Sequence, residues 1–332
     1  MINVAIVGAT GLVGREVIKV MEETDFPSEQ LFLCASEKSI GKSIAYKGKE
    51  YGVHSVEEGI DAHCPIAIFS AGSEVSKKYA PAFAQTGTYV IDNSSYWRLF
   101  DQIPLVVPEI NANTISQHTS IISNPNCSTI QLVMALAPLH ATYKIKRLVI
   151  STYQSVTGTG MKAVQQLMAE RNGEYVERVY PYPIDLNCFP HGGTFLPNGY
   201  TTEEQKLVDE THKILNDPSI KITATVVRIP VTGGHSESVN VEFEKPYAIN
   251  EIKTLLDKMP GVTVLDEPEK NLYPTPIMAA GKNEVFVGRL RRDETVNNGL
   301  NMWIVADNLR KGAATNAVQI ASYIYNTFFH HV

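Results

Sequence analysis

A cysteine near the middle of the chain stands between a tight turn and a long apolar run. Residues 123–129 read SNPNCST, and the apolar run at 130–139 predicts a helix. A thiol at a helix N-terminus lies at the positive end of the helix dipole, which lowers its pKa and increases the thiolate fraction. Cys127 is therefore a candidate nucleophile, although a lone cysteine can also serve only as a small packing residue.

Three basic side chains could assist a reactive thiol. His235 follows two glycines between predicted strands, where a neutral imidazole could take a proton from the thiol or from a hemithioacetal. Arg228 ends the predicted strand 220–228, where its guanidinium could hold a carboxylate in a bidentate manner. Arg98 follows another strand, at the carboxyl end of a sheet where ligands bind. A structural role in a loop remains open for His235, and a surface salt bridge remains open for Arg228.

The segment 201–206 (TTEEQK) predicts the start of a helix. Thr202 with Gln205 fits a capping box, and acidic residues in a first turn interact favourably with the helix dipole. Lys206 is spaced to pair with Glu203 along the helix. The pattern by itself therefore predicts a structural role for this segment.

The N-terminal residues predict a nucleotide site. Gly8, Gly11 and Gly14 follow the apolar strand 4–7 and open a helix, and glycines placed in this way let a pyrophosphate approach backbone N–H groups. The spacing is GxxGxxG, a short variant of the dinucleotide fingerprint.

The end of the second predicted strand indicates which dinucleotide binds. An acidic residue there holds the ribose hydroxyls of NAD, whereas basic and hydroxyl residues suit the 2′-phosphate of NADP. Ser36, Lys38 and Ser39 form a set that suits a phosphate, and Glu37 is the member that does not fit. We therefore expect NADP.

Two patterns of secondary structure divide the chain. In the first part, short apolar strands alternate with helices, which predicts a Rossmann-like, doubly wound parallel sheet; the strands are 4–7, 31–33, 66–69, 89–91, 105–107 and 120–122. In the second part, longer and partly alternating strands predict an α+β domain with a mixed sheet; they are 147–156, 220–229, 236–243, 284–289 and 300–305, with helices at 162–171, 203–215 and 249–258. A last helix, 313–328, could pack back on the first domain.

Composition limits the classes of protein to consider. The chain has 332 residues and a net charge of −6, which suggests two domains and no nucleic-acid surface. Its four cysteines form no CxxC pair, so we expect neither a metal site nor a disulfide framework. Neither a basic leader nor a membrane-length apolar run stands out, so we expect a cytoplasmic protein without a membrane partner.

Nine ordered motifs resemble the aspartate-β-semialdehyde dehydrogenase family in its shorter bacterial form, over nearly the whole chain. They are 8–14 (GATGLVG), 92–98 (DNSSYWR), 107–111 (VPEIN), 124–129 (NPNCST), 154–160 (QSVTGTG), 198–206 (NGYTTEEQK), 228–231 (RIPV), 233–237 (GGHSE) and 307–313 (DNLRKGA). One departure is Lys38, where the family often has arginine.

The resemblance implies a role for each site residue. Cys127 would attack the aldehyde, His235 would act as acid and base, and Gln154 would orient the thiol or intermediate. Substrate binding would fall to Arg228 for the α-carboxylate, Glu203 for the amino group, and Arg98, Lys206 and Asn126 for the phosphate. NADP would be held by Gly8, Thr10, Gly11, Leu12, Val13, Ser36, Lys38, Ser39, Ser70, Ala71, Gly72, Asn93, Ser155, Gly158 and Asn308.

The resemblance also implies an organisation and a reaction. Residues 1–126, completed by the C-terminal helix 311–332, would bind NADP, and residues 127–310 would catalyse the reaction and dimerise. The protein would be a homodimer or homotetramer. It would convert L-aspartyl 4-phosphate to L-aspartate 4-semialdehyde through a Cys127 thioester, in the biosynthesis of lysine (through diaminopimelate), threonine, methionine and isoleucine.

Two alternatives remain at this point. One is N-acetyl-γ-glutamyl-phosphate reductase, which performs the same chemistry on a longer, acylated substrate that would not need an acid such as Glu203. The other is a catalytically idle, NADP-binding paralogue, which the presence of Cys127, Gln154, Arg228 and His235 disfavours.

Overall fold

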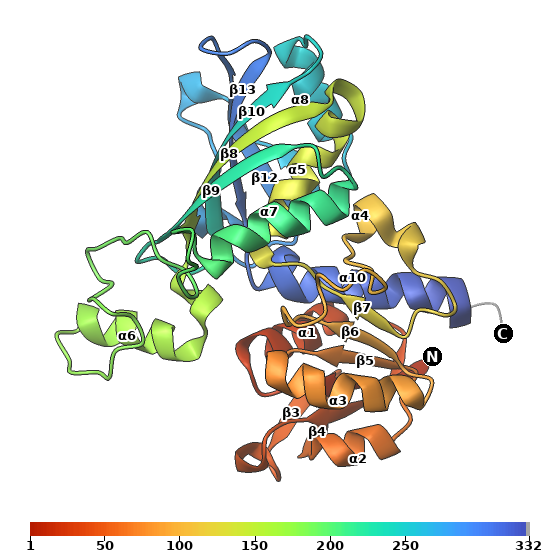
Figure 1. The fold of residues 1–332 in the computed structure, drawn as a ribbon. Coiled ribbons are helices and arrows are strands. Elements are labelled where there is room, and N and C mark those ends of the chain that lie inside the picture. The colour runs from red at the N-terminus through yellow and green to blue at the C-terminus, as the bar shows by residue number, and fades with distance from the viewer. Residues whose placement is uncertain (330–332) are drawn as a thin grey trace. The chain divides into compact units, whose positions relative to one another are not determined.

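The chain divides into two compact units in the computed structural model, which describes residues 1–329 (Figure 1). Unit 1 comprises Met1–Asn126 together with the segment that starts at Ala313, and unit 2 comprises Cys127–Gly312. Residues 330–332, the end of the expected C-terminal helix segment, lie outside the described residues. Each unit has its own sheet and is described separately.

Unit 1 is built on a seven-stranded sheet with the order β3-β4-β2-β1-β5-β6-β7. Neighbouring strands are parallel except for the edge pair β3–β4, which is antiparallel. The strands are β1 (Ile2–Val7), β2 (Ser28–Cys34), β3 (Ser43–Tyr46), β4 (Lys49–His54), β5 (Ile66–Phe69), β6 (Tyr89–Asp92) and β7 (Ile121–Ser123). Because β2 and β5 lie on opposite sides of β1, the strand order reverses there, and ligands bind at such a switch point.

Helices cover both faces of this sheet. They are α1 (Leu12–Glu23), α2 (Val56–Asp61), α3 (Ser73–Gln85), α4 (Pro108–Asn111) and α10 (Thr315–Ile324). Two separate apolar clusters, one with residues of α1 and α10 and the other with residues of α2 and α3, pack against the strands. This burial on both faces explains why β1 and β5 are continuous apolar runs. The doubly wound α/β fold predicted from the sequence is confirmed.

Two details of unit 1 differ from the sequence prediction. The expected strand 105–107 forms only a single bridge between Leu105 and Ser123, because Pro104 and Pro108 flank this short segment and Pro108 begins α4. The C-terminal helix is not uniform: a π-helical turn at Arg310–Ala314 precedes α10, and another at Tyr325–Phe329 follows it.

Unit 2 is built on a six-stranded mixed sheet with the order β11-β12-β13-β10-β8-β9. The pairs β8–β9 and β11–β12 are parallel and the others are antiparallel. The strands are β8 (Ile145–Gln154), β9 (Lys221–Arg228), β10 (His235–Phe243), β11 (Val262–Val264), β12 (Val285–Asp293) and β13 (Gly299–Ala306), and the helices are α5 (Cys127–Tyr143), α6 (Met161–Arg171), α7 (Thr202–Leu215), α8 (Ile249–Asp257) and α9 (Pro276–Ala279). The predicted mixed sheet is confirmed.

Helix α5 packs against β8, β10, β12 and β13, and also against α7 and α8. Nine of the eleven residues from Cys127 to Ala137 are buried, so this part of the helix lacks an exposed polar face and the sequence shows it as a plain apolar run. It begins at Cys127, three residues before the predicted start.

The capping box of α7 differs from the predicted pair. Thr201, not Thr202, is the N-cap, and its side chain accepts a hydrogen bond from the backbone N–H of Glu204. The Glu204 carboxylate in turn accepts from the backbone N–H groups of Thr201 and Val226 and is buried. The prediction of Thr202 with Gln205 was wrong by one residue, because the sequence offers two adjacent threonines and two adjacent acidic residues.

Candidate active site

Three of the expected site residues meet at one edge of the unit 2 sheet. Gln154 and Arg228 end the parallel strands β8 and β9 and are paired in register. His235 begins β10, which runs antiparallel to β8 with Ser236 opposite Tyr153. All three side chains are buried. The topology therefore brings an amide, a guanidinium and an imidazole from three segments to one place.

Helix α5 brings Cys127 to the same edge. Its second residue, Ser128, accepts a hydrogen bond from Gln154 Nε2 at 3.0 Å. The thiol residue is half-buried and packs closely against Gly312, where an added Cβ would lie 2.9 Å from Cys127 Cβ. Because it starts a helix, Cys127 lies where the helix dipole favours a thiolate.

His235 is held as a neutral imidazole with a defined tautomer. The backbone N–H of Ser155 donates to His235 Nδ1 at 3.0 Å, so Nδ1 is an acceptor and the proton is on Nε2. Burial and the charge of Arg228 lower the pKa of His235 to about 3, although the Glu203 carboxylate opposes the shift in part. This imidazole can donate a hydrogen bond from Nε2 throughout the physiological pH range.

Arg228 is buried and only partly paired. One terminal N–H group donates to the Ser155 carbonyl at 2.6 Å, and the guanidinium lies 6.0 Å from the ring centre of Tyr180. Within the part of the chain that the structure describes, Arg228 Nε has no hydrogen-bond partner. A buried donor without a partner is unfavourable, so this atom is suited to a ligand that carries an acceptor such as a carboxylate.

The first turn of α7 contributes an ion pair to this region. Lys206 Nζ lies 2.9 Å from a carboxylate oxygen of Glu203, as the helical spacing predicted. The carboxylate of Glu203 acts on the pKa of His235, which places the two groups in electrostatic contact. Gly192 fits closely here, since a Cβ on it would lie 3.2 Å from Glu203 Cβ.

The remaining expected residues of unit 2 surround the turn after β8. Ser155 caps the short helix Val156–Thr159, and Thr157 donates to Asn308 Oδ1 at 2.8 Å. A Cβ on Gly158 would lie 3.0 Å from His235 Nε2 and 3.2 Å from an Arg228 nitrogen. Gly158 therefore leaves open the space beside the imidazole proton.

In unit 1 the three glycines form a close turn between β1 and α1. Gly8 has φ +90°, and a Cβ on it would lie 2.8 Å from the carbonyl carbon of Ser70, while a Cβ on Gly14 would lie 2.2 Å from Gly8 O. Gly11 is the N-cap of α1, and no side chain among residues 1–329 caps this helix. Its first backbone N–H groups are therefore available to an anion, and the cradle fits a pyrophosphate.

The other expected dinucleotide residues of unit 1 lie at the carboxyl ends of neighbouring strands. Ser36 and Lys38 follow β2 and are exposed, whereas Ser39 is buried and accepts from Thr10 Oγ1 at 3.4 Å. Leu12 and Val13 are half-buried in the first turn of α1. The expected residues after β5 and β6 are half-buried or exposed; they are Ser70, Ala71, Gly72 and Asn93.

Arg98 is directed at the backbone of its own unit. It is buried, and it donates from Nε to the Asn124 carbonyl at 3.0 Å and from a terminal nitrogen to the Asn93 carbonyl at 2.8 Å. These bonds tie the loop after β6 to the segment that leads to Cys127. Asn126, also buried, is the last residue of unit 1 before the nucleophile.

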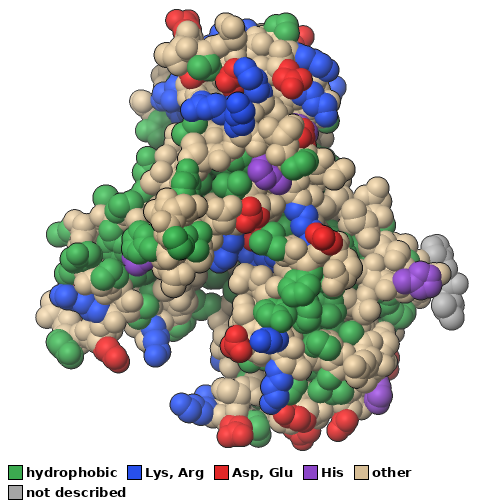
Figure 2. Space-filling view, in the orientation of Figure 1, with side chains coloured by type: hydrophobic (Ala, Val, Ile, Leu, Met, Phe, Trp, Pro, Cys, Tyr) green, Lys and Arg blue, Asp and Glu red, His purple; other side chains and the backbone are tan. Residues whose placement is uncertain are grey.

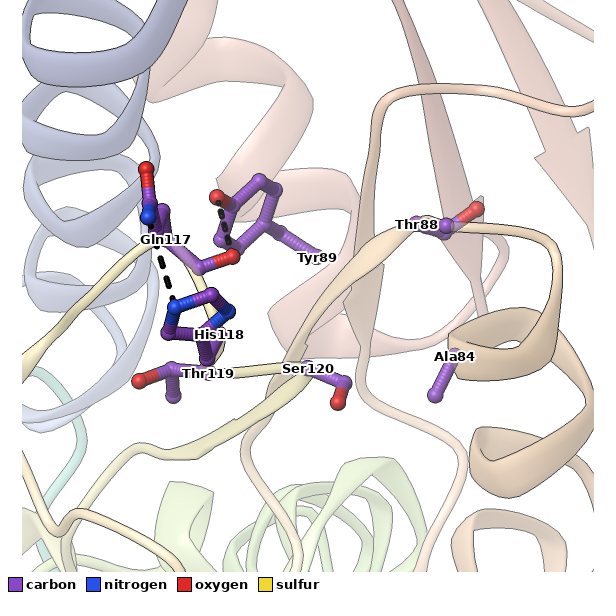
Figure 3. A pocket seen from close by; sticks show the side chains of 8 residues that line it. Ala84, Thr88, Tyr89, Gln117, His118, Thr119 and Ser120 are labelled. Atoms are coloured by element: carbon purple, nitrogen blue, oxygen red, sulfur yellow. Dashed lines mark hydrogen bonds between the residues drawn. The ribbon is translucent and has the colours of Figure 1, made fainter.

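A separate pocket of about 180 Å³ lies in unit 1 near the starts of β6 and β7 (Figure 3). There the Tyr89 hydroxyl donates to the Gln117 carbonyl, and the Gln117 amide contacts the His118 ring. Because the strands are parallel, this pocket lies at the opposite edge of the sheet from the glycine turn. None of the expected site residues lines it.

Comparisons with known proteins identify the family. One family model, described as "Semialdehyde dehydrogenase, NAD binding domain", matches residues 3–118, and another, "Semialdehyde dehydrogenase, dimerisation domain", matches residues 136–311. The chain belongs to the semialdehyde dehydrogenase family. No helix within residues 1–329 has both the length and the apolar character that crossing a membrane requires.

Individual members of the family are similar over nearly their whole length. The aspartate-semialdehyde dehydrogenase of Aquifex aeolicus (strain VF5) is 51% identical, with 97% of each chain covered. The enzyme of the same name from Legionella pneumophila is 48% identical over 98% of this chain and 96% of its own. A crystal structure of aspartate semialdehyde dehydrogenase II from Vibrio cholerae, complexed with ASA, has a TM-score of 0.95 at 44% identity and covers 99% of both chains. The resemblance drawn from the motifs is confirmed.

Two polar residues near the nucleophile were not predicted from the sequence. Ser128 links the start of α5 to Gln154, and Glu237, two residues after His235, is fully buried on the same face of β10. The pattern His-x-Glu at the start of a strand was a usable signal for Glu237, because alternate residues of a strand share a face. In the sequence, however, an isolated glutamate is most often exposed.

Proposed function

We propose that this chain is an NADP-dependent aspartate-semialdehyde dehydrogenase, which reduces L-aspartyl 4-phosphate to L-aspartate 4-semialdehyde and releases phosphate. The observation that supports it best is the convergence, at one sheet edge, of a helix-terminal thiol, a neutral imidazole and a buried arginine whose Nε has no hydrogen-bond partner within residues 1–329. The family membership and the similarity to enzymes of this name point to the same reaction.

The thiol and the imidazole divide the covalent chemistry in this proposal. The Cys127 thiolate attacks the acyl carbon, phosphate leaves, and a thioester remains on the protein; a thiolate is both a good nucleophile and a good leaving group. His235 donates from Nε2 to the oxygen on which negative charge develops. This donor role follows from the tautomer that the Ser155 N–H selects, so His235 is not positioned to take the thiol proton at Nε2 in the resting state.

Two charged side chains of unit 2 suit the two ends of an amino acid. Arg228 would hold the α-carboxylate, using the Nε donor that lacks a partner within unit 2. Glu203 would hold the α-amino group, which distinguishes aspartate semialdehyde from an N-acetylated substrate. Lys206 would then act on the phosphate, together with Arg98 and Asn126. Glu203 and Lys206 are paired with each other, so binding of the substrate would replace part of this ion pair with contacts to the amino group and the phosphate.

The dinucleotide would be held mainly by unit 1. The glycine turn and the uncapped start of α1 fit its pyrophosphate, and Ser36, Lys38 and Ser39 at the end of β2 suit the 2′-phosphate of NADP. The exposed Lys38 supplies the positive charge. When bound, NADPH supplies the hydride that reduces the thioester.

Unit 2 would also form the subunit interface of a homodimer. The matching family model is described as a dimerisation domain. The region around α6 exposes large apolar side chains, which gather over this part of the molecule (Figure 2); they include Tyr175, Tyr182, Leu186 and Phe195. Such an exposed group is typical of an interaction surface. A reactive Cys127 thiol is best maintained in the reducing cytoplasm, which is the location we propose.

The direct test runs the reaction in reverse. Purified protein is given aspartate semialdehyde, phosphate and NADP, and the absorbance of reduced nicotinamide is followed. Turnover that requires phosphate and disappears in Cys127→Ser supports the proposal. Absence of turnover with a folded protein, or a higher kcat/KM for the semialdehyde of N-acetylglutamate, would refute it. Light scattering after size exclusion reports the oligomeric state and separates a dimer from a tetramer.

A further inference from the structure

A layer of six buried polar side chains lies between helix α5 and the sheet of unit 2, directly behind the nucleophile. Each is at most 1% exposed, and three segments supply two side chains each; they are Ser128 and Gln131 of α5, Thr152 and Gln154 of β8, and His235 and Glu237 of β10. Residues three apart on a helix and two apart on a strand share a face, so both members of each pair point into this layer. Such a cluster inside an apolar core needs its polar atoms to be paired.

Glu237 is the ionisable group at the centre of this layer. It lies opposite Thr152 in the β8–β10 register, and Ser128 and Gln131 approach its carboxyl group from α5. Neither approach has the full geometry of a hydrogen bond, and within residues 1–329 both carboxyl oxygens lack a partner, as do Gln131 Oε1 and Thr152 Oγ1. Among residues 1–329, no cation is one of the groups that shift the pKa of this carboxyl group.

A protonated carboxyl group satisfies these atoms better than a carboxylate does. The protonated form can donate its hydrogen to Gln131 Oε1 and accept from the hydroxyls of Ser128 and Thr152. A carboxylate could only accept, so Gln131 Oε1 would stay unpaired and a charge would be buried without a counter-ion. Burial raises the pKa of Glu237 well above its ordinary value and outweighs the contacts with Gln131 and Ser128, which lower it. Burial, together with the Gln131 Oε1 acceptor that lacks a partner within residues 1–329, therefore favours a neutral acid.

We propose that Glu237 is a positioning residue that acts through Ser128 to fix the side chain of Gln154 beside Cys127. The Ser128 hydroxyl has one hydrogen, and it already accepts from Gln154 Nε2 at 3.0 Å. If this hydrogen goes to Glu237, the Ser128 oxygen keeps its lone pair directed at Gln154. The two hydrogen bonds, from the Ser128 hydroxyl to Glu237 and from the Gln154 amide to Ser128, then set the orientation of the Gln154 side chain.

This inference rests on the proposed function for its catalytic consequence only. Gln154 ends β8 at the sheet edge that carries His235 and Arg228, and it is bonded to the residue that follows the nucleophile. A misplaced amide there would disturb the thiol or the intermediate without changing the residues that bind substrate and dinucleotide. Loss of the Glu237 contact is therefore expected to lower kcat and to leave KM largely unchanged.

The decisive experiment compares Glu237→Leu, Glu237→Gln and Gln154→Ala in a double-mutant cycle. Glutamine keeps the shape of a protonated glutamate and retains a donor and an acceptor, whereas leucine has neither. We expect Glu237→Leu to lower kcat ~10- to 100-fold, as a displacement of up to about 1 Å does, and Glu237→Gln to stay within about threefold of the parent. In the Gln154→Ala background, Glu237→Leu should lower kcat less than about twofold further. Additive losses, or equal losses for leucine and glutamine, would overturn the proposal.

Two readouts need no substrate and keep this test separate from that of the proposed function. The first is the rate at which iodoacetamide alkylates Cys127 in a Cys188→Ser background, because Cys188 is the exposed thiol and Cys34 and Cys64 are buried. The effects of Glu237→Leu and Gln154→Ala on this rate should be non-additive. The second is the infrared band of a protonated carboxyl group, which should be present at pH 7 and vanish in Glu237→Gln. A parent without turnover refutes the function alone, and an additive alkylation cycle or a missing band refutes the role of Glu237.

Discussion

Two buried ionisable groups of strand β10 are expected to change stability in opposite directions as the pH changes. The folded-state pKa of His235 is lowered from 6.5 to about 3, so its neutral form stabilises the fold above pH 6.5, and this stability is lost as the pH falls toward 3. The pKa of Glu237 is raised above 4.5, so its contribution is fully present below pH 4.5 and is lost as the pH rises.

The two effects overlap between pH 4.5 and pH 6.5. Where only the unfolded chain changes protonation, a group changes the free energy of unfolding by at most about 1.4 kcal/mol per pH unit, with positive slope for His235 and negative slope for Glu237. In the parent the two slopes oppose each other. Glu237→Gln leaves only the histidine contribution, so its free energy of unfolding should rise with pH more steeply than that of the parent in this window, and His235→Gln should differ from the parent in the opposite direction.

Urea unfolding at a fixed protein concentration measures these slopes. The chain has two tryptophans, and a Trp97→Phe background leaves Trp303, in β13, as the fluorescent reporter of unit 2. Differences between variants remove the contributions of all other groups. If Glu237→Gln has the same pH dependence as the parent, Glu237 is ionised in the folded protein and the reasoning is refuted. If His235→Gln has the parent's slope, the imidazole is not held neutral.

Three further outcomes are expected. Cys127→Ser should remove turnover but leave dinucleotide binding intact by calorimetry; surviving turnover would show that another group is the nucleophile. Gly14→Ala should abolish dinucleotide binding or unfold unit 1, because the new Cβ would lie 2.2 Å from a carbonyl oxygen, whereas the control Gly52→Ala, where the nearest atom is 3.8 Å away, should bind as the parent does. Gly158→Ala must displace His235 by a few tenths of an ångström, which should lower kcat by roughly 4- to 10-fold if a 1 Å shift corresponds to ~10²-fold. An unchanged kcat would show that the new Cβ is accommodated without moving His235.

Local patterns were enough to predict most of the fold. Short apolar strands with intervening helices indicated a sheet covered on both faces, and the glycine turn after β1 was predicted because only glycine fits such a close approach. The edge hairpin β3–β4 was missed because its strands are short and partly exposed, so they have no continuous apolar signal. The capping box of α7 was displaced by one residue because adjacent threonines give the same signal.

The sequence by itself determined the candidate nucleophile, the dinucleotide turn and the family, because each depends on residue types at fixed spacing within one motif or within several ordered motifs. Only the tertiary structure decided which distant groups meet, such as the Ser155 N–H that sets the tautomer of His235 and the Ser128 hydroxyl that binds Gln154. It showed that Arg228 Nε has no partner within residues 1–329. It also showed that Glu237 is buried among polar side chains. These properties depend on strand register and burial, which bring together residues 26 to 80 positions apart in the chain and which no local pattern encodes.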